Sequence, residues 1–495
     1  MSSYSASGRQ ILQRLARAAM LERGLLPEFS AAALRETNAF KDAANLTAPG
    51  KIHDLRQLLW ASIDNDDSLD LDQLSVAEPR GNGAICVWVA IADVDALVHR
   101  GSAIDDHARH NTASVYTAGH TFAMLPERLS TDLTSLRQDV ERLAIVVEMV
   151  VDTEGKVGQS DLYQAMVLNR AKLAYNSVAA WLDGSAAPPP AVSSVPGMDE
   201  QIRLQDRVAA TLRSQRHVRG ALMLETIETQ PVFVDEALRE LLPDRKSRAH
   251  ELIEDLMVAA NGVVAQYLER RGVPSIRRVL RAPKRWDRIV ALAADVGERL
   301  PSVPDAPALN AFLARRRQVA PERFPDLSLS VIKLLGSGEY VADRPGQKVP
   351  GHFGLAVRDY THSTAPNRRF PDVINQRLLK ATLAGGSSPY AFPYAEGELE
   401  GLAAHCTVQE NVIAKVERQV AKSAAALLLA GRTGEVFDAI VTGAADKGTW
   451  VRIPSPPVEG KLTEGGQGAD VGERLKVRLI HTDVERGFID FARQR

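Results

Sequence analysis

The sequence predicts an α+β protein of several domains, in which a short helical amino-terminal module precedes an α/β body and a small all-β barrel. Its 495 residues are too many for one ordinary hydrophobic core. Two apolar runs, 84–98 and 143–152, are typical of buried strands in a central sheet. After Gly431 the pattern changes to short alternating strands separated by turns, as in a barrel.

The first predicted unit covers residues 1–50 and contains two helical stretches, ILQRLARAAMLERGLL and FSAAALRETNAF. A helix-turn-helix is one arrangement of such a pair, but helices of this kind are too common to identify it. The body covers residues 51–431, with strands in its first part and long helices after a loop rich in Pro, Ser and Ala at 183–197. The barrel covers residues 432–495.

Composition excludes several classes of protein. No apolar run reaches the roughly 18–20 residues of a membrane span, and the first residues lack the apolar core and cleavage pattern of a secretory signal. The two cysteines, Cys86 and Cys406, are far apart, which argues against a disulfide scaffold and against a cysteine-built zinc site. We therefore expect a cytoplasmic protein that does not associate with membranes.

The most informative segment is SIDNDDSLDLDQ (62–73), which carries five aspartates: Asp64, Asp66, Asp67, Asp70 and Asp72. Mutual repulsion makes this density unfavourable unless a cation neutralises it, and hard oxygen ligands suit Mg²⁺ or Mn²⁺. An exposed acidic loop is the competing interpretation. A calcium loop is not supported, because the segment lacks the glycine of the sharp turn and the final glutamate.

Positive charge is concentrated in the stretch 270–288, which includes Arg278 and contains a single acidic residue, Asp287. The formal net charge of −2 does not by itself indicate a nucleic-acid partner. A local basic groove can nevertheless lie on a neutral protein. We predict that Arg278 binds nucleic acid, and the alternative is a solvated helical face.

The segment HDLRQLLWASIDNDDSLDLDQ (53–73) resembles the opening motif of the ribonuclease II / ribonuclease R (RNB) family, in which Asp-Leu-Arg precedes an Ile-Asp pair and an Asp-x-Asp-Asp cluster. Asp64, Asp70 and Asp72 fall on the first three family aspartates. The resemblance implies that these three bind Mg²⁺, with Mn²⁺ as a substitute, and that Asp72 is catalytic. It also implies an RNB-type α/β catalytic domain for the body.

The chain departs from the family at Gln73, where the fourth aspartate is expected. An amide cannot supply the negative charge of a carboxylate ligand. Three consequences are open: Asp66 or Asp67 compensates, one metal is held more weakly, or activity is impaired.

The segment DYTHSTAPNRRFPDVINQRLL (359–379) resembles the family's Thr-Ser-Pro-Ile-Arg-Arg-Tyr-x-Asp signature. Ala365 and Asn367 replace the serine and the isoleucine, while Arg368 and Arg369 are retained. The resemblance implies that Arg368 donates hydrogen bonds to the phosphate as negative charge develops on it, and that Arg369 contacts RNA. A surface arginine pair without a ligand is the alternative.

Three shorter similarities extend the resemblance along the body. The resemblance implies that Tyr116 stacks on a base at the RNA 3′ end, whereas a partly buried loop tyrosine is the alternative. Glu254 and Asp255 fall on a helical acidic pair of the family. Glu417 falls on the acidic residue of its last helix and is predicted to be catalytic, with a weak surface ion pair as the alternative.

The carboxy-terminal barrel resembles the OB-type RNA-binding domain that ends these enzymes. Trp450 lies where such domains expose a stacking aromatic residue, and Phe488 and Phe491 are expected in the core. Three basic residues would add contacts to phosphates: Lys447, Arg452 and Lys461.

The resemblance as a whole implies a 3′→5′ exoribonuclease that hydrolyses single-stranded RNA to nucleoside 5′-monophosphates. Family members usually carry cold-shock-type barrels before the catalytic domain, and residues 1–50 cannot hold two of them. We expect single-stranded RNA as the partner, no nucleotide cofactor and a monomer. The alternative is a non-catalytic RNA-binding protein on a decayed RNB scaffold, which Gln73 favours. A DNA nuclease is a weaker alternative, which a requirement for the ribose 2′-hydroxyl would dismiss.

Overall fold

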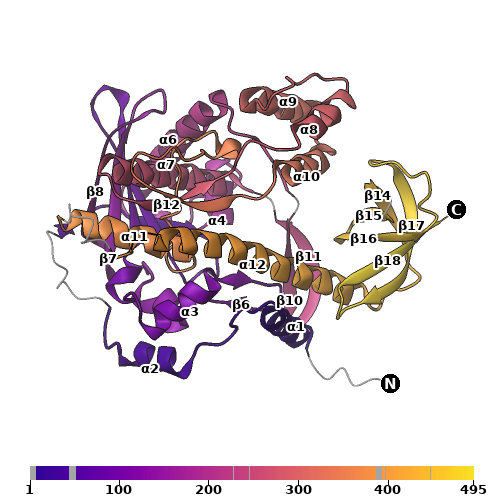
Figure 1. The fold of residues 1–495 in the computed structure, drawn as a ribbon, viewed down its shortest axis with the longest axis horizontal. Coiled ribbons are helices and arrows are strands. Elements are labelled where there is room, and N and C mark those ends of the chain that lie inside the picture. Colours follow the sequence, from indigo (N-terminus) through magenta and orange to yellow (C-terminus); the bar gives the residue numbers. More distant parts are fainter. Residues whose placement is uncertain are drawn as a thin grey trace.

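The computed structural model describes residues 7–43, 52–226, 228–244, 246–385, 393–395, 397–445 and 448–494. An amino-terminal helical segment, a mixed sheet covered by long helices and a terminal barrel follow one another along the chain (Figure 1). The predicted α+β architecture is therefore confirmed. In the part of the chain that the structure describes, no helix combines the length and apolar character needed to cross a membrane.

The body is organised around a sheet with the strand order β1-β8-β7-β4-β3-β2-β9. Its strands are β1 (His53–Asp54), β2 (Ala61–Asp64), β3 (Gln73–Pro79), β4 (Ile85–Ala92), β7 (Glu141–Val151), β8 (Val157–Leu168) and β9 (Ala171–Ala174). The apolar runs predicted as buried strands are β4 and β7, which are antiparallel neighbours. The sheet is parallel only where β1 meets β8 and β2 meets β9.

Helices cover this sheet and extend beyond it. The longer helices of the body are α3 (Ala103–Asn111), α4 (Tyr175–Leu182), α6 (Met198–Val218), α7 (Arg248–Arg270), α11 (Phe370–Leu383) and α12 (Glu398–Leu429). Short pieces connect them: η1 (Gly81–Gly83), η2 (Val94–Ala96), η3 (Arg128–Leu133), α5 (Pro190–Ser193) and η4 (Phe353–Leu355). Helix α12 spans the molecule from the body to the barrel (Figure 1).

A smaller lobe and three ribbons complete the body. The lobe contains α8 (Trp286–Ala294), α9 (Ala306–Val319) and α10 (Phe324–Leu335). The ribbons pair β5 (Val115–Tyr116) with β6 (Thr121–Phe122), β10 (Glu228–Val234) with β11 (Ala237–Asp244), and β12 (Ser275–Val279) with β13 (Glu339–Asp343). The stretch 270–288, considered as a solvated helical face, runs instead from the end of α7 through strand β12, which carries Arg278.

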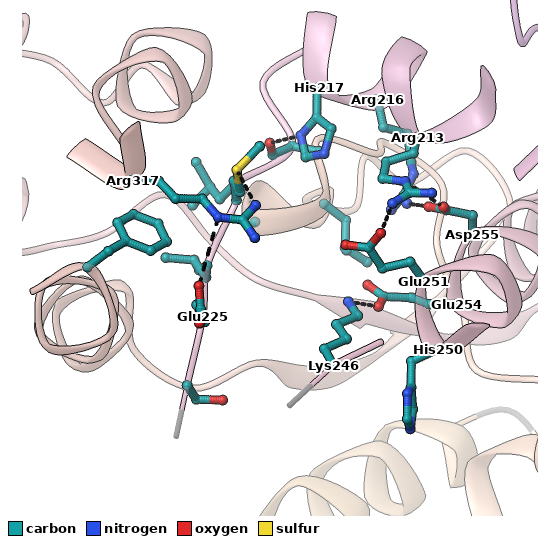
Figure 2. A pocket seen from close by; sticks show the side chains of 18 residues that line it. Arg213, Arg216, His217, Glu225, Lys246, His250, Glu251, Glu254, Asp255 and Arg317 are labelled. Atoms are coloured by element: carbon teal, nitrogen blue, oxygen red, sulfur yellow. Dashed lines mark hydrogen bonds and ion pairs between the residues drawn. The ribbon is translucent and has the colours of Figure 1, made fainter. Parts of the chain in front are cut away.

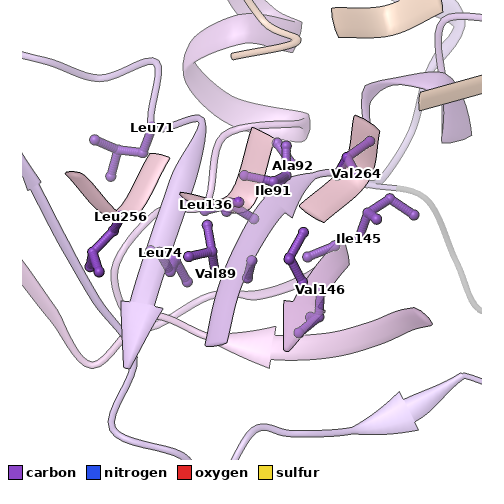
Figure 3. Close-up of a cluster of buried hydrophobic side chains, with 14 of the residues drawn as sticks. Leu71, Leu74, Val89, Ile91, Ala92, Leu136, Ile145, Val146, Leu256 and Val264 are labelled. Carbon is purple, nitrogen blue, oxygen red and sulfur yellow. The ribbon is translucent and has the colours of Figure 1, made fainter. Parts of the chain in front are cut away.

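The main hydrophobic core lies between the sheet and α7. Val89 of β4 and Val146 of β7 are fully buried and belong to the same hydrophobic cluster as Leu256 and Val264 of the helix (Figure 3). Apolar side chains on successive turns of α7 are buried, because the helix packs against α6 and α4 as well as against the sheet. This layer fixes the ends of β2 and β3, where the acidic segment lies.

The terminal strands close into a barrel in the order β14-β15-β16-β18-β17. They are β14 (Val436–Ala445), β15 (Gly448–Pro454), β16 (Pro457–Glu464), β17 (Arg474–Asp483) and β18 (Phe488–Arg493). The barrel closes through a parallel contact between β16 and β18. Phe491 is fully buried as predicted, but the prediction for Phe488 is wrong, because this residue starts β18 at the rim and is 53% exposed.

The amino-terminal segment contains α1 (Gly8–Glu22) and α2 (Ala31–Ala39). Ser7 caps α1 in a reciprocal capping box with Gln10. The two helices pack on different parts of the body, α1 on α12 and α2 on α3. Each helix is therefore held chiefly by the body.

Replacing Leu256 by Ala should lower the free energy of unfolding of the body by about 2–5 kcal/mol, because the side chain is fully buried between α7 and the sheet. Urea denaturation followed by tryptophan fluorescence measures this change. The matched control is Val319→Ala at a residue 72% exposed, which should stay within about 0.5 kcal/mol of the parent. Equal effects of the two substitutions would contradict the placement of Leu256 in the core.

Candidate active site

The predicted metal-binding aspartates lie where two neighbouring strands meet their connecting loop. Strand β2 ends at Asp64 and β3 begins at Gln73, and the two strands are antiparallel neighbours. The Gln73 side-chain amide donates a hydrogen bond to Asp64 Oδ1 over 3.2 Å. Because β2 ends where β3 begins, Asp64 and Asp72 lie at the same end of these two neighbouring strands.

Asp72 is almost completely buried, at 2% exposure, and it is held by the second predicted motif. The backbone N–H of Asn367 donates to Asp72 Oδ1 over 2.8 Å, and Arg368 Nε donates to Oδ2 over 3.0 Å. Burial raises the pKa of Asp72 to about 7, although the Arg368 guanidinium acts in the opposite direction. Two motifs nearly three hundred residues apart thus form one site.

Asp64 and Asp70 complete the carboxylate cluster. Burial raises the pKa of Asp64 to about 6, with Arg368 opposing the shift and Asp70 adding to it. Burial also raises the pKa of Asp70. Asp64 Oδ2 is buried and has no hydrogen-bond partner within the described part of the chain. A buried carboxylate oxygen without a donor carries a free-energy penalty that a cation could relieve.

The donor set of this cluster fits a hard divalent cation. It consists of carboxylate oxygens, which Mg²⁺ and Mn²⁺ prefer, and the unpartnered Asp64 Oδ2 supplies a free ligand atom. Each Asp72 oxygen accepts one hydrogen bond and retains a second lone pair. Across the described residues, no group of three or more His, Cys, Asp or Glu side chains is already arranged to hold a metal ion.

Arg368 is the predicted catalytic arginine and remains accessible beside the carboxylates. Its side chain is 42% exposed, and the bond to Asp72 uses only Nε. At the neighbouring substitution, the buried Asn367 side chain accepts a hydrogen bond from the Thr134 hydroxyl over 2.6 Å, while its Nδ2 has no partner among the described residues. The change from isoleucine to asparagine in this motif therefore leaves Arg368 in contact with Asp72.

Tyr116 lies in β5 next to the same cluster. The residue is 46% exposed, while burial of its hydroxyl raises the pKa to about 12 against the influence of Arg368. Asp70 and Asp72 also act on this hydroxyl. Ser114, two residues earlier, donates its N–H to the Arg368 carbonyl over 3.0 Å. The structure therefore brings the predicted stacking tyrosine to the carboxylates and to Arg368.

The side chain of Glu417 contacts the backbone of Tyr116. One of its carboxylate oxygens accepts a hydrogen bond from the Tyr116 N–H over 2.9 Å. The residue comes from α12, which passes beneath β5. This contact gives Glu417 a role in holding the tyrosine strand.

Two arginines predicted to bind RNA are engaged by protein partners. Arg369 donates to the fully buried Asp372 over 2.8 Å. Arg278 is only 14% exposed, donates to Glu410 over 2.5 Å and lies over the Tyr340 ring. Their positive charge is therefore largely compensated within the protein, and their contact with RNA stays a prediction.

The predicted stacking residue of the barrel, Trp450, lies on the outer face of β15, where Lys461 of β16 is its cross-strand neighbour. Arg452 on the same strand donates to Asp326 of α10 over 2.6 Å and thereby ties the barrel to the body. Lys447 lies outside the described residues. The barrel thus carries its predicted stacking surface on a domain other than the carboxylate cluster.

A pocket of about 520 Å³ lies between the α6–α7 pair and the smaller lobe, which contributes Arg317 and Phe324 (Figure 2). The predicted acidic pair lines it, with Asp255 held by Arg213 and Arg216, and Glu254 paired with Lys246. Because positive and negative side chains compensate one another here, the pocket is a mixed polar cavity and not a strong anion site.

The pocket adjoins the carboxylate cluster through two residues that sequence reasoning missed. His250 of the pocket stacks on Tyr175, with ring centroids 3.8 Å apart. The charges that act on the Tyr175 hydroxyl include those of Asp64 and Arg368. Tyr175 follows β9 directly, so a search for aromatic residues at the end of the strand beside Asp64 could have identified it.

Comparison with known proteins gives the same picture as the geometry. The RNB domain family matches residues 52–385, and the RNase II-type exonuclease C-terminal S1 domain matches residues 435–494. Ribonuclease R of Aquifex aeolicus is 29% identical over 88% of this chain and 64% of its own length. Ribonuclease R of Thermotoga maritima is 28% identical over 94% of this chain and 68% of its own length. Ribonuclease R of Escherichia coli is 27% identical over 89% of this chain and 57% of its own length. The chain therefore spans between 57% and 68% of these relatives.

Solved structures share the fold at low sequence identity. RNase R of Mycoplasma genitalium, in complex with ribose-methylated single-stranded RNA, has a TM-score of 0.86 at 22% identity and covers 98% of this chain and 78% of its own. Yeast Ssd1, described as a pseudonuclease, has a TM-score of 0.72 at 15% identity and covers 96% of this chain and 58% of its own. The same fold thus occurs with and without nuclease activity.

Cation binding by the carboxylate cluster should weaken as the pH falls below about 7, because protons compete for Asp72 and Asp64, with pKa values of about 7 and about 6. In cation-free protein, the stability that these two groups contribute is present below about pH 4 and is lost as the pH rises through these values. Calorimetric titration with Mn²⁺ at about pH 5 and about pH 8 checks the first effect. An affinity independent of pH would contradict the assignment of Asp64 and Asp72 as ligands.

Proposed function

The chain belongs to the RNB family, and from this premise we propose that it is an exoribonuclease that shortens single-stranded RNA from the 3′ end and releases nucleoside 5′-monophosphates. The observation that carries the proposal is the contact of Arg368 with Asp72 beside the unpartnered oxygen of Asp64. It combines oxygen ligands for a cation with an accessible guanidinium, and phosphodiester hydrolysis requires both.

We propose that Asp64, Asp70 and Asp72 hold Mg²⁺, with Mn²⁺ as a substitute. The cation would supply charge neutralisation at the phosphate and activation of the attacking water. The buried, unpartnered Asp64 Oδ2 supports this assignment, because a cation would satisfy an atom that the described protein leaves without a partner. The raised pKa values of all three carboxylates also support it, since a nearby cation would favour their ionised forms.

Arg368 is the group proposed to stabilise negative charge on the phosphate. Asp72 orients the guanidinium through Nε, and the remaining N–H donors of the same side chain can reach phosphate oxygens. Because its side chain is 42% exposed, an RNA end can approach it without rearrangement of the sheet. Water then attacks phosphorus, the bond to the preceding 3′ oxygen breaks, and the released nucleotide keeps its 5′-phosphate.

The RNA chain is proposed to be held by stacking more than by charge. Tyr116 offers an exposed aromatic ring at the carboxylates, and Trp450 offers a half-buried ring on the outer face of the barrel. Arg278 and Arg369 are already compensated by acidic partners. The neutral pocket beside His250 has room for a nucleoside and adjoins the cluster. The buried free thiols of Cys86 and Cys406 support a reducing, cytoplasmic environment.

A non-catalytic RNA-binding protein is the second candidate, and Gln73 favours it. This residue is buried next to Asp64, and its amide group donates where a carboxylate would attract a cation. The structural likeness to a pseudonuclease means that the fold alone cannot separate the two candidates.

The proposed activity predicts that 5′-labelled single-stranded RNA shortens progressively to a small labelled core in the presence of Mg²⁺ and stays intact with a chelator. Asp72→Asn should abolish shortening, because it removes a ligand charge and the charged partner of Arg368. Gel analysis of the labelled RNA, with chromatography of the released nucleotides, measures both effects. RNA that is bound but never shortened would contradict the proposed exoribonuclease activity and support the non-catalytic RNA-binding protein.

Replacing Gln73 by Asp should strengthen Mn²⁺ binding by about tenfold, because it adds a carboxylate beside Asp64. Calorimetric titration measures the affinity. The matched control is Gln73→Asn, which keeps an amide and should bring no gain. An unchanged affinity in the aspartate variant would show that another carboxylate of the loop already supplies the missing charge.

A further inference from the structure

The helix α1 lies at a junction of elements that are distant in sequence. Its buried residues Leu12, Ala16 and Met20 share one hydrophobic cluster with residues of α12 and of the β5–β6 hairpin. In Figure 1, α1 lies beside α12, next to β6 and to the β10–β11 ribbon. The amino-terminal segment is therefore in direct contact with the strand that carries Tyr116.

The closest of these contacts is made by Gly119 at the tip of the β5–β6 hairpin. A Cβ atom added there would lie 2.8 Å from Leu12 Cβ, 2.9 Å from Gln13 N and 3.1 Å from Arg9 O. Two of these atoms belong to the backbone of α1, which cannot rotate away as the end of a side chain can. The residue is thus required to be small because the hairpin rests directly on the helix.

The other sides of the hairpin are fixed as well. Glu417 accepts the Tyr116 N–H over 2.9 Å, and Ser114 donates to the Arg368 carbonyl over 3.0 Å. Val115 and Phe122 are buried in the cluster shared with α1 and α12. Tyr116 remains 46% exposed between these supports. The position of the Tyr116 ring relative to the carboxylates therefore depends on the remaining support of the hairpin, which is its contact with α1.

The position of α1 is itself anchored on the side away from the active site. The Arg9 N–H donates to the Glu236 carbonyl over 3.1 Å, and its guanidinium lies 4.2 Å from the centroid of the Phe233 ring. Arg14 forms an ion pair with Glu485 of the barrel. The helix is thus fixed by the β10–β11 ribbon and by the barrel before it meets the hairpin.

We propose that α1 is a positioning element of the active site, which acts through Gly119 to set the Tyr116 ring at the height where it stacks on the terminal base of the RNA. The inference rests on the proposed function, because it assigns the RNA 3′ end to Tyr116. It adds that the amino-terminal helix, which lies outside the matched catalytic domain, determines how productively that end is held. A misplacement of about 1 Å at such a contact can cost about a hundredfold in rate.

Gly119→Ala in the full chain tests the proposal. The added methyl group should push the hairpin off α1, so that the hydrolysis rate at saturating RNA falls by about tenfold or more, while overall RNA affinity changes little because the barrel still binds. The matched control is Gly81→Ala, at a glycine with open space around it and no contact to α1, which should leave both values unchanged.

The decisive readout is a double-mutant cycle with Tyr116→Ala. Single-stranded RNA with 2-aminopurine at its 3′ end, bound with chelator, reports stacking of the terminal base by fluorescence quenching. If Gly119 acts through Tyr116, each single substitution reduces the quenching, and Gly119→Ala adds little in the Tyr116→Ala background. Equal effects of Gly119→Ala in both backgrounds would overturn the proposal.

Two further measurements keep these outcomes separate. Quenching unchanged by Tyr116→Ala alone would instead refute the assignment of the RNA 3′ end to Tyr116, on which the proposal rests. Should Gly119→Ala melt at a much lower temperature than the parent, Leu12→Ala replaces it in the cycle, because it loosens the support without adding atoms. Loss of quenching in Leu12→Ala that depends on Tyr116 supports the proposal, and loss independent of Tyr116 overturns it.

Discussion

The buried contact between Asp72 and Arg368 is the constraint on which the rest of the site depends. An ionised carboxylate at 2% exposure is costly unless donors surround it. The Arg368 guanidinium and the Asn367 N–H provide these donors. The loop before α11 is thereby attached to the end of β3, and through Ser114 the strand of Tyr116 is attached to that loop. One ion pair thus connects the carboxylates, the guanidinium and the aromatic ring.

The same contact does not decide whether the site is catalytic. Asp64, Asp70 and Asp72 bring three negative charges, and Arg368 compensates one of them. The remaining charge matches one divalent cation better than two, because Gln73 contributes a neutral amide in place of a fourth carboxylate. The proposed activity therefore depends on the charge at this site and not on the fold alone, which an RNA-bound ribonuclease R and a pseudonuclease share.

Much of this arrangement could be predicted from the sequence, because patterns of polarity report burial. The strands β4 and β7, the barrel and the meeting of the two charged motifs followed from apolar runs and from family-like residues. The exposure of Phe488 could not be predicted, since a position at the rim of a strand has the same local pattern as one in the core. The acidic partners of Arg278 and Arg369 could not be predicted from the sequence either, because both ion pairs depend on tertiary geometry. The requirement for a small residue at Gly119 could not be predicted either, since it comes from contact with α1, which lies about a hundred residues earlier in the chain.

Whether a basic residue can bind a phosphate depends on whether its side chain is already paired with a carboxylate of the protein. Arg278, Arg369 and Arg452 each lie against an acidic partner, so their release toward a phosphate would leave a carboxylate uncompensated. Arg368 differs because its partner occupies one nitrogen and its side chain stays 42% exposed. Under the proposed function, the exposed ring of Tyr116 is a further means of holding a flexible polyanion, so the packing beneath Tyr116 would bear on that function.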